Sequence, residues 1–279
     1  PGFNLRIAKW AKKKGIKVFY YISPQIWAWH SSRVHQIKKS VDRMFVILPF
    51  EKDFYQGFDC EVDFVGHPLL DMIKARPLNP NFLTQHGLGK KPIIALLPGS
   101  RKQEITRILT GMLAVMPYFE DYEFVIAGAP SMPDQFYADL TAPLPYSVKL
   151  IQNQTYDLLQ HATAALVTSG TATLETALFK VPQVVCYSGS PVSYAIAKQL
   201  INVKFISLVN LIIDRMIVRE LIQHDFNLQN LRTALSQILQ TKNREVIEKD
   251  YEELIQILGD AGASARTAKL MYNYLVKTP

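Results

Sequence analysis

The stretch PIIALLPGSRKQEI, residues 92–105, shows the structural unit from which the chain is built. Its first part is a short run of aliphatic residues, 93–97, which predicts a strand buried on both faces. A helical pattern starts at Lys102 and is expected to continue to about Met116. A short apolar strand followed by a helix is typical of a parallel sheet with crossover helices, so the stretch predicts an α/β fold.

The same alternation continues toward the C-terminus. Further strands are expected in EFVIAGAP, SVKLIQ, AALVTSG and QVVCYS, with helices near 133–140, 155–161 and 171–180. Five strands with helices between them predict one doubly wound domain, which we place at 92–262. We also expect a helix near 191–200, an irregular segment at 201–213, and helices near 215–222, 227–239 and 243–276, the last broken at Gly259 and Gly262.

Toward the N-terminus, the order helix then strand repeats. FNLRIAKWAKKKG precedes KVFYYIS, SSRVHQIKKSV precedes DRMFVILP, and EKDFYQGF precedes EVDFVG. Residues 1–75 are therefore expected to form part of a second α/β domain, with the proline-containing and glycine-containing segment 76–91 as the linker. The chain starts at Pro1 without a signal-peptide pattern, which we interpret as the interior of a longer protein.

Composition excludes several classes of protein. With 279 residues, 48% of them hydrophobic and 20% charged, the chain fits a folded protein of one or two domains. No apolar run approaches the roughly 20 residues of a membrane-spanning helix. Cys60 and Cys186 lack the spacing of a disulfide framework or a zinc site, and the histidines show no zinc spacing either. We interpret the two cysteines as buried thiols in a reducing compartment.

The net charge of +7 is unevenly distributed. Residues 1–43 carry ten Lys and Arg against one acidic residue, whereas residues 92–279 carry 16 against 17. A basic N-terminal surface predicts an anionic partner such as a phosphate, a lipid headgroup or a nucleic acid. The alternative, that the charge only aids solubility, stays open.

The loop 97–101 follows a buried strand and precedes a helix. In an open α/β sheet, ligands bind beyond the carboxyl ends of the strands, where this loop lies. Gly99 lets a ligand approach the backbone, Ser100 can cap the helix, and Arg101 adds a forked donor beside the helix N-terminus. The combination predicts a diphosphate site. A capped turn with a surface arginine is the alternative.

A second loop of this kind occurs in VTSGTATLE, residues 167–175. Ser169, Gly170 and Thr171 offer hydroxyls and backbone N–H groups at another helix N-terminus. Glu175 lies one turn inside that helix, where a carboxylate can accept two hydroxyl protons as in ribose recognition, or can simply favour the helix dipole. Together the loops predict a nucleoside diphosphate, although neither is a Walker loop or a GxGxxG motif.

Six motifs share one interpretation. SPQIWAW (23–29), LPFEKDFY (48–55), VGHPLLD (65–71), LLPGSRKQEI (96–105), SGTATLE (169–175) and SLVNLI (207–212) resemble, in the same order, the lipid-A-disaccharide synthases. These are inverting glycosyltransferases of GT-B type, with two Rossmann-like domains. The resemblance implies transfer of 2,3-diacylglucosamine from UDP to 2,3-diacylglucosamine 1-phosphate, which gives UDP and the β-1,6 lipid A disaccharide of lipopolysaccharide.

The resemblance also implies the surroundings of the reaction. No metal or cofactor is expected, because the UDP-sugar is a substrate. The enzyme would be cytoplasmic and peripheral on the inner membrane of a Gram-negative bacterium, in contact with an anionic membrane surface and without a nucleic-acid partner. A homodimer is left open. The first domain would be incomplete here, so the chain is expected to bind UDP while its turnover is left open.

Site residues follow from the resemblance. Those for the donor are Gly99, Ser100, Arg101, Ser169, Gly170, Thr171, Glu175 and Asn210, with Val209 where the family has proline. Ser23, Trp27 and Trp29 would face the acceptor and lipid side, unless the two tryptophans are core residues. Arg101 would act in catalysis by stabilising the leaving diphosphate. His67 would have only a positioning role in the cleft, or would be an ordinary turn residue. The catalytic base would lie upstream of Pro1.

The C-terminal segment 263–279 is expected, by resemblance, to form a helix that crosses back to the first domain. Two other functions stay open. One is a UDP-sugar 2-epimerase-like enzyme, which also uses two Rossmann-like domains but does not explain the basic N-terminal part. The other is a non-catalytic module that binds an anionic surface or nucleic acid, although the chain has no RNP, KH or helix-turn-helix signature.

Overall fold

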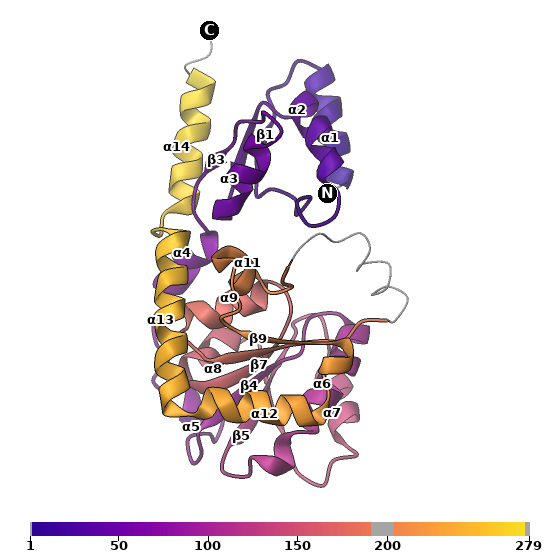
Figure 1. Cartoon of the computed structure of the whole chain (residues 1–279), viewed down its shortest axis with the longest axis vertical. Coiled ribbons are helices and arrows are strands. Elements are labelled where there is room, and N and C mark those ends of the chain that lie inside the picture. The colour runs from indigo at the N-terminus through magenta and orange to yellow at the C-terminus, as the bar shows by residue number, and fades with distance from the viewer. Residues whose placement is uncertain (1, 191–203, 277–279) are drawn as a thin grey trace. The chain divides into compact units, whose positions relative to one another are not determined.

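The computed structural model describes residues 2–190 and 204–276. These residues fall into two compact units. Unit 1 consists of residues 2–76 and 255–276, and unit 2 consists of residues 77–190 and 204–254. Figure 1 labels the elements of both units. The helix expected near 191–200 lies outside the described residues.

Unit 1 contains a three-stranded parallel sheet in the order β1-β2-β3. Its elements are α1 (Gly2–Lys13), β1 (Phe19–Tyr21), η1 (Ser31–Arg33), α2 (Val34–Ser40), β2 (Arg43–Val46), α3 (Pro49–Gln56), β3 (Asp63–Phe64), α4 (Pro68–Lys74) and α14 (Ala263–Val276). Leu5 of α1, Ile37 of α2 and Tyr55 of α3 are buried together with Met44 and Val46 of β2. The helices thus cover the sheet as a parallel β-α-β arrangement requires.

The C-terminal helix α14 is held on unit 1 by polar contacts near its start. Arg266 donates from Nε to the carbonyl of Val65 at 2.8 Å and from Nη2 to the carbonyl of Asp260 at 2.7 Å. Asp71 of α4 accepts from the backbone N–H groups of Gly262 and Ser264. The part of the C-terminal segment that belongs to unit 1 begins at residue 255, earlier than the expected boundary at 263.

Unit 2 contains a six-stranded sheet in the order β6-β5-β4-β7-β8-β9, with every pair parallel. The strands are β4 (Ile93–Leu97), β5 (Glu123–Gly128), β6 (Lys149–Gln152), β7 (Ala162–Thr168), β8 (Gln183–Tyr187) and β9 (Arg219–Ile222). All five residues of β4 are buried, as the apolar run predicts. The order is that of a doubly wound fold, and it reverses between β4 and β7. The predicted α/β class is confirmed.

Helices cover this sheet (Figure 1). The helices of unit 2 are α5 (Phe82–Gln85), α6 (Lys102–Leu113), α7 (Asp134–Thr141), α8 (Thr155–His161), α9 (Thr171–Leu178), α11 (Leu208–Ile213), α12 (Leu228–Leu239) and α13 (Thr241–Leu258), with the 3₁₀ turns η2 (Met116–Tyr118) and η3 (Gln223–Asp225). The last residues of α13, from 255 onward, belong to unit 1. The break predicted in the last helical segment is confirmed. Gly259 and Gly262, which separate α13 from α14, have φ angles of 80° and 104°, where L-residues are disfavoured.

Three local predictions are wrong. The segment 215–222 was predicted to be helical, but its second half is β9, because pairing with β8 outweighs the weak local preference of those residues. The segment 201–213 was predicted to be irregular, but it contains α11, whose N-cap Ser207 accepts a hydrogen bond from the N–H of Asn210. The linker predicted at 76–91 belongs to unit 2 from residue 77 onward, because Phe82 and Leu88 are buried in that unit's core.

Membrane-spanning and metal-binding features can be assessed for residues 2–190 and 204–276. Every helix in this part of the chain falls short of the length and apolar character that spanning a bilayer requires. The same residues contain no cluster of three or more His, Cys, Asp or Glu side chains arranged to hold a metal ion. Cys186 is buried as predicted, but Cys60 is only partly buried because it lies in the loop before β3.

Candidate functional site

The two predicted loops meet in unit 2. They follow β4 and β7, which are neighbours at the point where the strand order reverses. This is where an open α/β sheet leaves a crevice beyond the carboxyl ends of its strands. A cavity of about 460 Å³ lies there, and it is lined by the predicted residues Gly99, Ser100, Arg101, Ser169, Gly170, Thr171 and Glu175. The fold therefore brings together residues that are up to 76 positions apart in sequence.

The loop after β4 has its glycine in the left-handed region, and the Glu104 carboxylate lies against it. Gly99 has a φ of 112°, and a Cβ added to it would lie 2.5 Å from Oε2 of Glu104. Arg101 is the N-cap residue of α6, so the cap predicted at Ser100 is wrong by one residue. The Arg101 side chain is exposed, and it makes no hydrogen bond or ion pair with the residues that the structure describes. Its guanidinium is thus available to a ligand.

The loop after β7 leaves space above its backbone. Gly170, the N-cap residue of α9, has a φ of 123°, and no atom lies within 4 Å of the position that its Cβ would occupy. Thr173 folds its hydroxyl back onto the carbonyl of Gly170 at 2.8 Å. The first backbone N–H groups of α9 lie at the positive end of the helix, where such groups can bind an anion.

Glu175 has a partner that sequence inspection missed. The hydroxyl of Tyr156, on α8, donates a hydrogen bond to Oε1 of Glu175 at 2.9 Å. Burial raises the pKa of Glu175 above its ordinary value, and this hydrogen bond lowers it in part. The sequence predicts that Tyr156 lies in the helix 155–161, but the helical pattern does not show that its hydroxyl reaches α9.

Other residues of the cavity were also missed. Glu104 and Thr168 line it, together with Thr155 and residues 127–130 at the end of β5 and just after it. The backbone there is held by Tyr137, whose buried hydroxyl accepts from the N–H of Ala129 at 2.8 Å. The carboxyl end of β5 adjoins that of β4. Because parallel strands end at the same edge of a sheet, the end of EFVIAGAP could have been predicted to lie beside the cavity.

Asn210 does not line this cavity. It is fully buried, and its side chain is saturated within unit 2: Nδ2 donates to Val218 O and Glu220 Oε1, and Oδ1 accepts from the N–H groups of Ile217 and Val218, all at 2.8–3.0 Å. An amide with all these positions filled has none left for a ligand. These contacts do not support the predicted binding role of Asn210, and they fix α11 against the turn before β9.

Unit 1 places the predicted acceptor-side residues at the carboxyl ends of its strands. Ser23 and Trp27 follow β1, and both are engaged by α3. Ser23 Oγ lies 2.8 Å from the hydroxyl of Tyr55, and Trp27 Nε1 donates to Glu51 Oε1 at 3.2 Å. Glu51 is buried, and that burial raises its pKa. Trp27 is half-buried, whereas Trp29 is 50% exposed, so Trp29 has the more accessible of the two indole rings.

His67 is a helix cap. It follows β3, and its Nδ1 accepts from the backbone N–H of Leu69 at 3.2 Å at the start of α4. Burial lowers the pKa of His67 to about 4, so the ring is neutral near pH 7, with its proton on Nε2. The turn-residue alternative describes these contacts. The Arg266 guanidinium packs over Gly66, where an added Cβ would lie 2.5 Å from Nη2.

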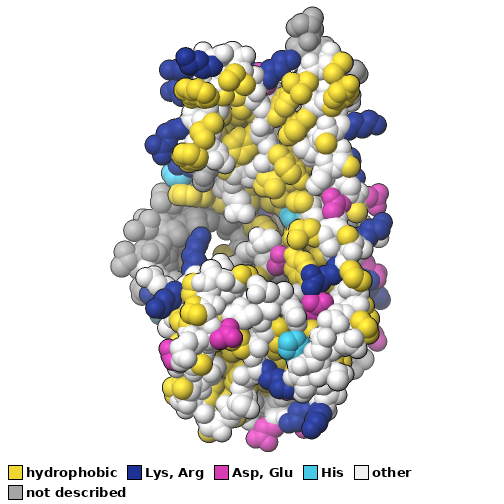
Figure 2. Space-filling model, turned by 180° about the vertical axis from the view of Figure 1, so that it is seen from behind, with side chains coloured by type: hydrophobic (Ala, Val, Ile, Leu, Met, Phe, Trp, Pro, Cys, Tyr) yellow, Lys and Arg dark blue, Asp and Glu magenta, His cyan; other side chains and the backbone are white. Residues whose placement is uncertain are grey.

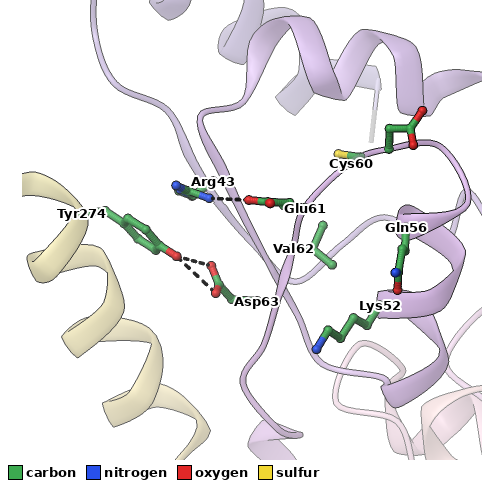
Figure 3. Close-up of a pocket in the computed structure, with 9 residues that line it drawn as sticks. Arg43, Lys52, Gln56, Cys60, Glu61, Val62, Asp63 and Tyr274 are labelled. Atoms are coloured by element: carbon green, nitrogen blue, oxygen red, sulfur yellow. Dashed lines mark hydrogen bonds and ion pairs between the residues drawn. The ribbon is translucent and has the colours of Figure 1, made fainter. Parts of the chain in front are cut away.

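A larger cavity of about 640 Å³ lies at the opposite, amino-terminal edge of the unit 1 sheet (Figure 3). Figure 3 shows Tyr274 of α14 pointing toward Asp63, to which its hydroxyl donates at 3.2 Å. Arg43 lies over the Tyr274 ring at 4.2 Å and approaches Glu61 at 3.5 Å. These contacts hold α14 on the sheet. The cavity contains none of the residues predicted to bind donor or acceptor.

Comparisons with known proteins bear on the whole chain. Residues 1–273 match the model of a family described as lipid-A-disaccharide synthetase. The lipid-A-disaccharide synthase of Syntrophus aciditrophicus (strain SB) is 41% identical over 285 residues, which cover 100% of this chain and 74% of that protein.

Solved structures show the fold. A UDP-GlcNAc 2-epimerase from Neisseria meningitidis, bound to UDP-GlcNAc, is 15% identical with a TM-score of 0.59, covering 98% of this chain and 73% of its own. CalG4, the calicheamicin glycosyltransferase, is 17% identical with a TM-score of 0.55, covering 99% and 73%. At such low identity these likenesses concern fold alone, and they confirm the predicted Rossmann-like architecture of GT-B type.

Proposed function

Because the chain belongs to the lipid-A-disaccharide synthase family, we propose that it transfers 2,3-diacylglucosamine from UDP to 2,3-diacylglucosamine 1-phosphate. The products would be UDP and the β-1,6-linked lipid A disaccharide. Family membership makes the chain a glycosyltransferase of lipid A biosynthesis, and more specifically a hexosyltransferase, as its six motifs predict. The identities of donor and acceptor, and the residues that bind them, are the proposal.

One observation carries the donor side of this proposal. Two helix N-termini, an exposed arginine and a half-buried glutamate line a single cavity at the switch point of unit 2. Helix N-termini and a guanidinium are donors that suit a diphosphate. A carboxylate nearby suits the paired hydroxyls of a ribose. The combination fits a nucleoside diphosphate such as UDP better than a single phosphate, which would leave Glu175 without a ligand partner.

The same groups give the cavity a part in the reaction. When the bond between the sugar and the diphosphate breaks, negative charge builds up on the leaving UDP. Arg101 and the N–H groups at the starts of α6 and α9 would stabilise that charge, because they are hydrogen-bond donors that line the same cavity. Glu175, held by Tyr156, would fix the ribose and thereby the position of the diphosphate.

Unit 1 has the surface that a lipid acceptor and an anionic membrane would require. Phe3, Ile7 and Trp10 of α1 are 69%, 48% and 58% exposed, and at this spacing they share one face of the helix. Arg6, Lys9 and Lys12 lie among them on α1, and Figure 2 shows the mixture of apolar and basic side chains from one side. An amphipathic basic helix of this kind suits a peripheral position, here the cytoplasmic face of a Gram-negative inner membrane.

The two alternatives receive less support. The N. meningitidis epimerase structure is 15% identical to the chain, which concerns fold alone, whereas the lipid-A-disaccharide synthase of S. aciditrophicus is 41% identical. A nucleic-acid-binding module would leave the cavity of unit 2 unexplained. Neither alternative accounts for a basic, partly apolar α1 together with a diphosphate-type cavity.

A transfer assay tests the proposal. The chain would be incubated in detergent micelles with UDP-2,3-diacylglucosamine and 2,3-diacylglucosamine 1-phosphate, and UDP and the disaccharide would be measured by chromatography. Disaccharide formation that requires both lipids is the expected result. Calorimetry with UDP on the same sample separates donor binding from turnover. A chain that binds neither UDP nor the donor would contradict the proposal.

A further inference from the structure

Glu104 lines the cavity of unit 2 and places a carboxylate between its two loops. Its Oε2 accepts from the backbone N–H of Ser100 at 3.4 Å, and its Oε1 accepts from the hydroxyl of Thr168 at 3.4 Å. The carboxyl group also covers Gly99, since a Cβ there would lie 2.7 Å from the Glu104 Cδ. The side chain thus spans the loops after β4 and β7.

The local sequence explains why the side chain takes this position. Glu104 is the third residue of α6, and a carboxylate in the first turn interacts favourably with the free N–H groups and the positive end of the helix. Gly99 provides the room, because any side chain at that position would collide with the carboxyl group. The protein's own carboxylate therefore occupies two of the donors that line the cavity.

We propose that Glu104 is the resident anion of this site, and that a nucleoside diphosphate binds only by displacing its carboxylate. The inference rests on the proposed function, which places a diphosphate here. Both anions use the same donors, the Ser100 N–H and the Thr168 hydroxyl, and like charges a few ångströms apart repel each other. The two contacts of Glu104 are long, at 3.4 Å, so displacement breaks only weak hydrogen bonds.

This arrangement has a consequence for turnover. Once the sugar has been transferred, UDP remains as a product whose diphosphate would otherwise be held firmly by Arg101 and two helix N-termini. A carboxylate that returns to the same donors lowers the affinity for the product and favours its release. Glu104 would therefore be a positioning and release residue rather than a catalytic one.

The experiment is a calorimetric comparison of uridine, UMP and UDP binding to the wild-type chain, Glu104→Gln and Glu104→Ala. Removing the negative charge should tighten UDP binding by about tenfold, tighten UMP binding less, and leave uridine binding unchanged. Glu248→Gln, an exposed carboxylate on α13, is the matched control and should behave as wild type for all three ligands. Circular dichroism melting checks that each variant is folded.

Three outcomes would overturn the inference. Weaker UDP binding by both Glu104 variants would make the carboxylate a ligand-binding group. Equal changes for uridine and UDP would show an effect on the cavity as a whole, and unchanged UDP binding by both folded variants would show that the charge does not compete. Failure of the proposed function looks different, because the wild-type chain would then bind neither UDP nor uridine.

Discussion

The hydroxyl of Tyr156 donates a hydrogen bond to Oε1 of Glu175 at 2.9 Å, joining two helices across 19 residues of sequence. The bond fixes one carboxylate oxygen at the edge of the unit 2 cavity. The other oxygen, Oε2, has no hydrogen-bond partner among the residues that the structure describes, so it can accept from a ligand. A cavity built in this way predicts how specific substitutions change nucleotide binding.

Tyr156→Phe should weaken uridine binding and make it more sensitive to pH. Burial already raises the pKa of Glu175, and loss of the hydrogen bond from Tyr156 would raise it further. Binding that needs the carboxylate is present above this pKa and is lost as the pH falls through it, so the loss should begin at a higher pH in the variant. Uridine affinity measured between pH 5 and 8 would show the shift.

The control for that substitution is Tyr146→Phe, which removes a hydroxyl that donates to the carbonyl of Leu113 outside the cavity. It should leave the pH profile of uridine binding unchanged. Identical profiles for Tyr156→Phe and wild type would mean that Glu175 does not contact the ribose.

Asn210→Ala should lower stability without altering the donor site. Removing the amide leaves the buried N–H groups of Ile217 and Val218 without their acceptor, at a cost of about 2–4 kcal/mol in the free energy of unfolding. Urea unfolding should be followed by circular dichroism. Tryptophan fluorescence would not report on unit 2, because the three tryptophans all lie in unit 1. Gln229→Ala, on the exposed side of α12, is the control. It should lower the free energy of unfolding by less than about 0.5 kcal/mol, as is usual for surface substitutions. UDP affinity lost from folded Asn210→Ala would contradict the structural role.

Gly99→Ala should be more harmful than Gly170→Ala. Both glycines have positive φ angles, of 112° and 123°, so alanine is strained at either position by about 1–3 kcal/mol. At Gly99 the new Cβ would also meet the Glu104 carboxylate, whereas nothing lies near it at Gly170. The melting temperatures of the two variants, compared with wild type, test this prediction. An equal decrease in melting temperature for both variants would show that Glu104 moves aside.

Anionic vesicles should bind the chain, and salt should weaken that binding. The basic residues of α1 provide attraction that is screened within about 10 Å at 0.1 M salt, and Phe3, Ile7 and Trp10 provide apolar contact. Sedimentation with anionic and with neutral vesicles, at low and high salt, measures both contributions. The variant with serine at Phe3, Ile7 and Trp10 should bind the vesicles more weakly. Val246→Ser, at an exposed position on α13, should bind them as well as wild type does. Binding that is indifferent to lipid charge and to salt would exclude this surface.

Sequence patterns predicted the architecture of unit 2 well because its signals are local. The aliphatic run 93–97 forms β4, and the small residues after it and after β7 line the cavity because parallel strands end at one edge. The sixth strand escaped prediction because Arg219–Ile222 has little strand character of its own and is stabilised by pairing with β8.

Side-chain roles were harder to predict, because they depend on contacts distant in sequence. Asn210 fits the resemblance to the family, yet its amide is saturated by residues 217, 218 and 220, which no pattern places around it. Glu104 lies in the motif 96–105, but the pattern assigns it no role, since only the fold brings it to Thr168. Sequence therefore indicated which loops line the cavity, whereas the packing of α6, α8 and α11 decides which side chains reach it.

The measurement that tests the central claim most directly is calorimetric titration of the chain with UDP, compared between wild type and Arg101→Ala. The account predicts that Arg101→Ala binds UDP about tenfold more weakly, because a charged hydrogen bond to the diphosphate is lost, while uridine binding is unchanged. Arg107→Ala, exposed on the same helix and away from the cavity lining, should match wild type. Equal UDP affinity for Arg101→Ala and wild type would remove Arg101 from the site and contradict the account.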